Sequence, residues 1–283
     1  MVASISSNGN GKLAGCVLLE LPLKEGQEQK ALELLMQHPH GVKYTMAQPG
    51  CGSYSIGLDG NVLVLNGYWE TKEQWIAYAG SRQVKEGKLG EKNAQWDETF
   101  GPFIDGELRA APMDIIKTYH GSAKDITKFS GMPRVEFPIM EDKLDEAVQV
   151  LMNHPHGIDF LMTMPGVKEV CLAKDTEKNS IIIMGKIESV GAYNTSAGSA
   201  PIFMCAHLII CVNPYVLRHA YLPSSPTFYL SHTDHWKDYL SKRQSDSGEL
   251  GKLNASWKEA FFPLVAGKPK TSCLEVSKYV SDI

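Results

Sequence analysis

The sequence contains two copies of a short element whose residue types could do acid–base chemistry. The first is His38-Pro39-His40-Gly41, and the second is His154-Pro155-His156-Gly157. An imidazole titrates near neutrality, so a histidine at the rim of a pocket can act as a general acid or base. A structural role is also open, because proline and glycine stop a helix and histidine at its end favours the helix dipole. No carboxylate at helical spacing completes a metal site with these histidines, so we expect no metal there. The candidate catalytic histidines are His38, His40, His154 and His156.

Two glutamates interrupt apolar stretches that are predicted to be strands. Glu20 lies within Leu18-Leu19-Glu20-Leu21, and Glu136 lies within Val135-Glu136-Phe137. A buried carboxylate without a partner costs several kcal/mol or becomes neutral, so each glutamate needs a partner. A salt bridge to arginine or lysine is one role. A raised-pKa acid or base facing a pocket is the other, and it makes Glu20 and Glu136 candidate catalytic residues.

Aromatic side chains recur at helical spacing beside the predicted sheet, where they could line a ligand cavity or fill the core. Two asparagines at helical positions near tryptophans could bond a ligand or tie a helix to a loop. We expect Arg82 and Arg243 to be surface or ion-pair residues. The candidate substrate-binding residues are Trp69, Trp75, Tyr78, Asn93 and Trp96 in the first copy, and Trp236, Tyr239, Asn254 and Trp257 in the second.

The elements that position these residues occur in two similar halves. Pro49-Gly50 follows the first histidine motif at the same distance as Pro165-Gly166 follows the second. Nine residues further along the first half match nine in the second in order and spacing, from Trp75 and Trp236 to Pro102 and Pro263. A match of this length predicts a duplicated unit, whose fold is one unit used twice.

Each half is predicted to run strand, helix, strand, strand, helix, strand. Asp59-Gly60-Asn61 between two apolar runs predicts a hairpin, and Thr71 with Gln74 forms a capping-box pattern. Glycines near 87 and 90 indicate a break in the second helix. The elements expected in the first half are strand 16–21, helix 25–37, strands 54–58 and 62–65, a broken helix 75–100 and a strand region 108–119. In the second half, strand 135–138 precedes helix 141–153, and strands 170–173 and 181–184 flank a longer turn at 175–179.

One segment of the second half has no counterpart in the first. About forty extra residues separate Glu188 from Asp234, and the apolar run inside them is too short to span a membrane. The run Pro223–Ser231 contains residue types with pyrimidine-rich codons, so a retained intron in the gene model is one hypothesis. A genuine loop or lid over a pocket is the other. We predict a disordered tail at 1–12, a first repeat at 13–122, and a second repeat at 130–283 with an unmatched insertion at about 190–231.

Composition excludes several classes of protein. The chain has 283 residues and a net charge of -4 with both signs mixed, which argues against nucleic-acid binding. Its six cysteines form no C-x-x-C pair, as expected for reduced thiols in a cytoplasmic protein. The first twelve residues lack the apolar region of a secretion signal. There is no dinucleotide or phosphate-binding motif, so we expect no cofactor. We also expect no metal and no membrane partner, because the histidine motifs lack a carboxylate ligand and the apolar run is too short for a membrane span.

A unit of this order can fold as a ferredoxin-like sandwich with one open sheet face, and two such faces can pack together. The sequence resembles the dimeric α/β-barrel superfamily, and within it the antibiotic biosynthesis monooxygenase-like domains. The resemblance is carried by Pro49-Gly50-Cys51, by Val64–Glu70 and by Thr71–Tyr78. It implies an α+β fold in which two ferredoxin-like repeats pack sheet to sheet as a pseudo-dimeric α/β barrel.

The resemblance also implies a range of activities, because fold alone does not fix chemistry. Haem-degrading members of the family have a helix histidine where this chain has Tyr78 and Tyr239, and Ile187 stands where Trp69 stands in the first copy, so haem degradation is disfavoured. We expect a monooxygenase-like enzyme that acts on an aromatic or polyketide-like small molecule without metal or flavin. The alternative is a non-catalytic ligand-binding or stress-response protein of the same fold. The chain is expected to be a monomer, as an intramolecular pseudo-dimer, or a homodimer.

Overall fold

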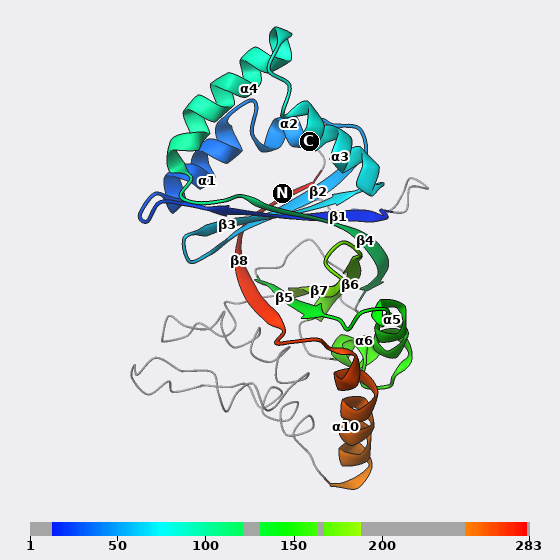
Figure 1. The fold of residues 1–283 in the computed structure, drawn as a ribbon. Coiled ribbons are helices and arrows are strands. Elements are labelled where there is room, and N and C mark those ends of the chain that lie inside the picture. Colours follow the sequence, from blue (N-terminus) through cyan, green and yellow to red (C-terminus); the bar gives the residue numbers. More distant parts are fainter. Residues whose placement is uncertain (1–12, 121–130, 164–166, 188–246, 282–283) are drawn as a thin grey trace. The chain divides into compact units, whose positions relative to one another are not determined.

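The computed structural model describes residues 13–120, 131–163, 167–187 and 247–281 (Figure 1). Side chains of 271–281 are not described. The chain divides into unit 1, residues 1–116 with 274–283, and unit 2, residues 117–273. The predicted tail at 1–12 and the predicted insertion at about 190–231 lie outside the described residues.

Unit 1 is an antiparallel sheet with its helices on one face (Figure 1). The strands pair in the order β4-β1-β3-β2-β8, so the C-terminal strand joins the first half of the chain. That strand was expected to belong to the second repeat, and the repeat boundaries themselves stay a prediction. The elements are β1 (Gly15–Pro22), α1 (Glu28–Gln37), α2 (Val42–Met46), β2 (Cys51–Asp59), β3 (Val62–Trp69), α3 (Lys72–Ser81), α4 (Gly87–Phe100), the 3-10 turn Gly101–Phe103, and β4 (Arg109–His120).

Unit 2 has a β5-β7-β6 sheet, with α5 against β7, α6 against β6 and α10 against α5. Its elements are β5 (Gly131–Pro138), α5 (Leu144–Asn153), α6 (Ile158–Met162), β6 (Val167–Asp175), β7 (Ser180–Ile187), α10 (Gly248–Phe261), the 3-10 turn Phe262–Leu264, and β8 (Lys270–Ser281), whose last residues pair in unit 1.

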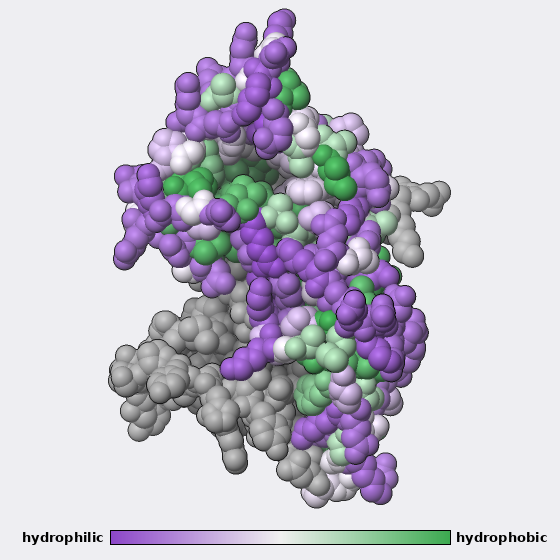
Figure 2. Space-filling view, viewed as in Figure 1, coloured by the Kyte–Doolittle hydropathy of each residue, from purple (hydrophilic) through white to green (hydrophobic). Residues whose placement is uncertain are grey.

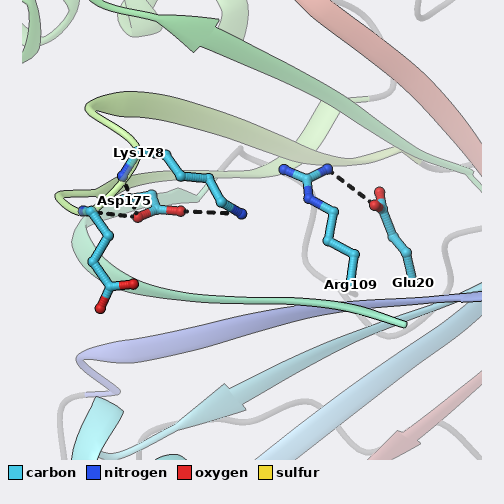
Figure 3. Close-up of polar contacts among 5 residues, drawn as sticks. Glu20, Arg109, Asp175 and Lys178 are labelled. Atoms are coloured by element: carbon cyan, nitrogen blue, oxygen red, sulfur yellow. Dashed lines mark hydrogen bonds and ion pairs between the residues drawn. The ribbon is translucent and has the colours of Figure 1, made fainter. Parts of the chain in front are cut away.

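The two units use the same strand register. Gly15 pairs with Trp69 and Pro22 with Val62 in unit 1, while Gly131 pairs with Ile187 and Pro138 with Ser180 in unit 2. Both hairpins are where the sequence predicts them: β2 and β3 turn at Gly60 and Asn61, and β6 and β7 turn at 176–179. In the longer turn, Asp175 accepts hydrogen bonds from the backbone of Glu177 and Lys178, each at 3.1 Å, and forms an ion pair with Lys178 (Figure 3).

The predicted helix ends at 37, 100 and 153 agree with the structure, whereas the predicted starts at 25, 75 and 141 each differ from it by three residues. Thr71 and Gln74 form the predicted capping box, and the predicted break separates α3 from α4 at Gly87, whose φ is +66°. Gly90, by contrast, lies inside α4. The helix expected from Glu25 begins at Glu28, because Gly26 at φ +77° is not helical. A short helix, α2, follows the first histidine motif and was not expected.

The core of unit 1 lies between the sheet and the helices. Alternate strand residues face the helices, since side chains along a strand point to opposite faces. Among the largest fully buried side chains of this core are Trp69, Leu63 and Ile56. The other sheet face carries Cys16, Leu18 and Glu20 of β1, and polar side chains of β2 and β3. This alternation separates the candidate residues into two groups, which lie on opposite faces of the sheet.

Candidate functional site

Arg82, at the end of α3, lies at the centre of an aromatic cluster on the helix side of unit 1. Its guanidinium carbon is 4.8 Å from the ring centre of Tyr44, 5.2 Å from that of Tyr78 and 5.7 Å from that of Trp96. A cation over aromatic faces is attracted by the ring quadrupoles, and the attraction grows as water is excluded. Among the described residues, no carboxylate pairs with Arg82, so the expected ion pair is absent, and the side chain is half-buried rather than fully at the surface. Arg243 lies outside the described residues.

A chain of hydrogen bonds leads from Arg82 through Tyr78 and Thr45 to Gly41. Its Nε donates to the hydroxyl oxygen of Tyr78 over 2.9 Å. That hydroxyl lies 2.6 Å from Oγ1 of Thr45, and the Thr45 hydroxyl donates to the carbonyl oxygen of Gly41 at 3.3 Å. Because Thr45 gives its proton to Gly41, Tyr78 is the donor to Thr45. The chain of bonds fixes the guanidinium and ends on the histidine motif. Nη1 of Arg82 is buried and has no hydrogen-bond partner in the described structure.

The aromatic rings continue from this cluster to the sheet. Tyr78 stacks on Trp69 with ring centres 5.4 Å apart, and the indole nitrogen of Trp69 donates to the hydroxyl of Tyr54 over 3.3 Å. Burial raises the pKa of Tyr54 well above its ordinary value, so this phenol stays protonated. Gly67 is required beside it, since a Cβ at Gly67 would overlap the Tyr54 ring.

The helix side of unit 1 is not closed everywhere. Figure 2 shows apolar side chains gathered in a hollow among the polar helical surfaces of this unit. Trp75, Tyr78 and Trp96 are only partly buried where they pack against the core, whereas Trp69 is fully buried. The predicted aromatic residues of the first copy are therefore together, with Trp69 beneath and the others nearer the surface. Trp236 and Tyr239 lie outside the described residues.

The two histidines of the first motif have different bonding. Nδ1 of His38 accepts the backbone N–H of His40 at 3.0 Å. Nε2 of His40 lies 2.8 Å from Oδ1 of Asn93, whose amide hydrogens both go to the carbonyl oxygens of Ser81 and Val84. Oδ1 of Asn93 is thus an acceptor and Nε2 of His40 carries the proton. Neutral His40 keeps a lone pair on Nδ1, whereas the corresponding lone pair of His38 is already used.

Burial, partly offset by the bond to Asn93, lowers the pKa of His40, and the Arg82 charge lowers it further. The imidazole is therefore neutral at neutral pH. Asn93 connects α4 to the segment between α3 and α4 through these hydrogen bonds. This is the structural alternative that the sequence left open for Asn93. With both amide hydrogens engaged and 1 % exposure, it has no donor left for a ligand.

In unit 2, the second motif repeats part of this arrangement. Nδ1 of His154 accepts the backbone N–H of His156 at 3.1 Å, and Nε2 of His154 is 3.1 Å from the Ser256 hydroxyl. His156, Asn254 and Trp257 are buried. Trp257 packs against His154, with ring centres 5.2 Å apart.

The glutamates lie on the sheet face that points away from the helices. Glu20 pairs with Arg109 of β4, with Nη1 3.0 Å from Oε2 (Figure 3). The expectation that Glu20 has a basic partner is confirmed. Glu136 is 6 % exposed at the matching position of β5. Because Glu20 and Arg82 are on opposite faces of one sheet, they do not form one site within unit 1.

Sequence reasoning missed Tyr44, Thr45, Tyr54 and Arg82 as site residues. A signal was available: Tyr44 and Thr45 follow the first histidine motif where Phe160 and Leu161 follow the second. A difference between the two copies at such a position indicates a residue that one copy needs and the other does not. Among the described residues, no group of histidine, cysteine and carboxylate side chains is arranged to hold a metal ion, and no helix is long and apolar enough to cross a membrane.

Comparison with solved structures shows which proteins share this fold. The chain is similar to an anthrone oxidase-like protein, at 15% identity with a TM-score of 0.53, over 95% of this chain and 94% of the other. A proposed monooxygenase from Fusobacterium nucleatum aligns at 10% identity and a TM-score of 0.54, over 95% and 94% of the two chains. A proposed monooxygenase from Lactobacillus acidophilus aligns at 9% identity and 0.53, over 95% and 97%. No family model and no curated protein matches the sequence. The chain therefore shares the α+β fold of these three solved structures, and fold alone does not fix its chemistry.

Proposed function

We propose that unit 1 binds a planar aromatic or polyketide-like molecule against the Arg82 cluster and oxidises it with dioxygen, without metal or flavin. The observation that carries the proposal is the buried Nη1 of Arg82, which lacks a partner while three aromatic rings surround the guanidinium. A ligand oxygen that carries negative charge would satisfy this donor, and the rings would contact a flat ligand. The likeness to an anthrone oxidase-like protein supports an enolisable aromatic substrate.

The reaction needs no added reductant. Loss of a proton from an activated methylene gives an electron-rich enolate, which can transfer electrons directly to dioxygen. One oxygen atom of dioxygen becomes the ketone oxygen on the former methylene carbon, and the other is released as water. The methylene carbon supplies all four electrons that reduce dioxygen. Arg82 would stabilise the enolate oxygen, as a donor placed where charge develops. His40 would take the proton on Nδ1, since it is the histidine of this motif whose neutral form keeps a lone pair for that step.

Two other observations favour the non-catalytic alternative. Glu20 is paired with Arg109, and His40 is bonded to Asn93. Paired glutamate and histidine side chains are what a ligand-binding protein without catalysis would show. Glu20, on the far face of the sheet, has no role in the proposed reaction. The catalytic and binding hypotheses then differ only in whether the bound molecule is oxidised.

Dithranol, a dihydroxylated anthrone, is a suitable probe because its methylene is acidic and its quinone is coloured. The protein should speed formation of the quinone, consume dioxygen, and place labelled oxygen from isotopic dioxygen in the new ketone. Binding of dithranol without faster quinone formation would leave the non-catalytic alternative standing. Absence of binding would remove the proposed function altogether.

A further inference from the structure

The hydroxyl of Thr45, in α2, uses every hydrogen bond that it can make. It donates to the carbonyl oxygen of Gly41 at 3.3 Å. It accepts from the hydroxyl of Tyr78 at 2.6 Å and, over a longer distance of 3.5 Å, from Nη2 of Arg82. A hydroxyl offers one donor and two acceptor lone pairs, so this hydroxyl has no lone pair left for a ligand.

These bonds hold two of the three nitrogens of the Arg82 guanidinium. Nε donates to Tyr78 at 2.9 Å, and Nη2 donates to Thr45. The rings of Tyr44 and Trp96 lie beside the same guanidinium. Because a guanidinium is planar and rigid, fixing Nε and Nη2 also fixes the direction of Nη1. Nη1 is the nitrogen that is buried and lacks a partner within the described ranges.

The local fold does not require a hydroxyl at this position. In unit 2, α6 begins after Gly157 as α2 begins after Gly41, and Leu161 stands where Thr45 stands. Leu161 is 6 % exposed, so the same short helix forms with an apolar side chain buried at this place. A bond from threonine to the carbonyl four residues earlier is common in helices. That bond does not explain why the two lone pairs of Thr45 are also used.

We infer that Thr45 is a positioning residue for the proposed reaction, which aims Nη1 of Arg82 at the ligand oxygen by holding Tyr78 and Nη2. This inference rests on the function proposed above. A donor that is fixed in advance stabilises the enolate more than the neutral ligand, because negative charge develops on the enolate oxygen. Loss of the Thr45 hydroxyl therefore slows oxidation more than it weakens binding.

The first test measures dithranol oxidation by variants of the full chain. Thr45→Val removes the hydroxyl and keeps the branched shape, so kcat should fall by about tenfold while KM changes little. Thr45→Ser keeps the hydroxyl and should retain most of kcat. Thr99→Val is the matched control, since Thr99 makes the same kind of bond to the carbonyl of Gln95 at an exposed position of α4. Equal losses in Thr45→Val and Thr45→Ser, or no loss in Thr45→Val, would overturn the inference.

The double variant separates positioning from a general structural effect. If Thr45 acts through Arg82, Thr45→Val should cause no further loss of kcat in the Arg82→Met protein, because no guanidinium remains to be aimed. A loss of the same size in both backgrounds would show that Thr45 acts independently of Arg82 and would overturn the inference.

A second measurement does not depend on turnover. Nuclear magnetic resonance detects the Nε–H of Arg82, which is assigned by its loss in Arg82→Met. Its exchange with water should be slow in the wild type and in Thr99→Val, and faster in Thr45→Val, because Tyr78 then loses the acceptor that orients its hydroxyl. Equal exchange in the wild type and in Thr45→Val would overturn the inference, whether or not dithranol is oxidised. The expected exchange rates without any oxidation of dithranol would support the positioning of Arg82 and overturn the proposed function.

Discussion

The imidazole of His40 and the amide of Asn93, 53 residues apart in the sequence, meet at 2.8 Å inside unit 1. The contact joins the histidine motif to α4, and the other bonds of Asn93 join α4 to the end of α3. The elements that carry Tyr44, Arg82 and Trp96 are therefore held by one amide. The site depends on this bond even though Asn93 contacts no ligand in our account.

Asn93→Leu should lower the free energy of unfolding by about 2–4 kcal/mol, because three hydrogen bonds are lost and buried partners are left unpaired. Urea unfolding followed by tryptophan fluorescence measures the change. Asn153→Ala is the control, since Asn153 is bonded only to Gln149 at an exposed position, and it should change stability little. Equal effects of the two substitutions would show that Asn93 does not organise the helices.

The lowered pKa of His40 predicts how stability depends on pH. Above about pH 6.5, the ordinary histidine value, the residue is neutral in both folded and unfolded chains. As pH falls below that value, the unfolded chain takes up a proton that the folded chain resists, so stability is lost until the folded pKa is passed. His40→Gln should reduce this loss between about pH 7 and pH 5. An unchanged pH dependence in the variant would rule out a lowered pKa.

Gly41 allows the chain to pass close to α1. A Cβ at this position would overlap the carbonyl oxygen of Leu35, which is backbone and cannot move aside easily. Gly41→Ala should therefore destabilise the protein by about 2 kcal/mol or more. Gly80→Ala in α3 meets no atom within 4 Å and should be neutral or stabilising by about 0.5–1 kcal/mol. Thermal unfolding measures the stability of both variants. Equal changes in the unfolding temperature would contradict the steric role of Gly41.

A substitution at Glu20 distinguishes the two roles considered for the glutamates, which are a salt bridge and a catalytic acid or base. Glu20→Gln leaves the helix side of unit 1 untouched, so dithranol oxidation should keep its rate while stability falls by about 1 kcal/mol through the weakened pair with Arg109. The same stability loss in Arg109→Gln would confirm that the pair acts as a unit. A hundredfold loss of turnover in Glu20→Gln, with an intact fold, would restore the catalytic assignment.

Local chemistry made much of the fold predictable. The Gly60 turn and the Thr71 capping box each depend on neighbouring residues, and both predictions were correct. The pairing of β8 with β2 was not predictable in this way, because residues more than 200 positions apart must meet and either edge of the sheet could accept the strand.

The site was less predictable than the fold. Arg82 is charged, and arginine is mostly found at the surface or in an ion pair, so the sequence suggested one of those two roles. It is held by Tyr44, Tyr78 and Trp96, which come from three different helices, and only the folded arrangement brings them together. Alternation along a strand shows which residues share a face with Glu20, but it does not show which of the two faces points to the helices. The face on which Glu20 lies could therefore not be predicted from the sequence.

The most direct measurement of the central claim is dithranol-dependent oxygen consumption by the wild-type protein and by Arg82→Met. Lys85→Met is the control. Lys85 lies three residues after Arg82 in the sequence, and its positive charge belongs to an exposed ion pair with Asp97. Loss of the one donor aimed at the enolate should lower kcat/KM by about a hundredfold in Arg82→Met, with little change in Lys85→Met. Turnover in Arg82→Met equal to that of the wild type would contradict the account.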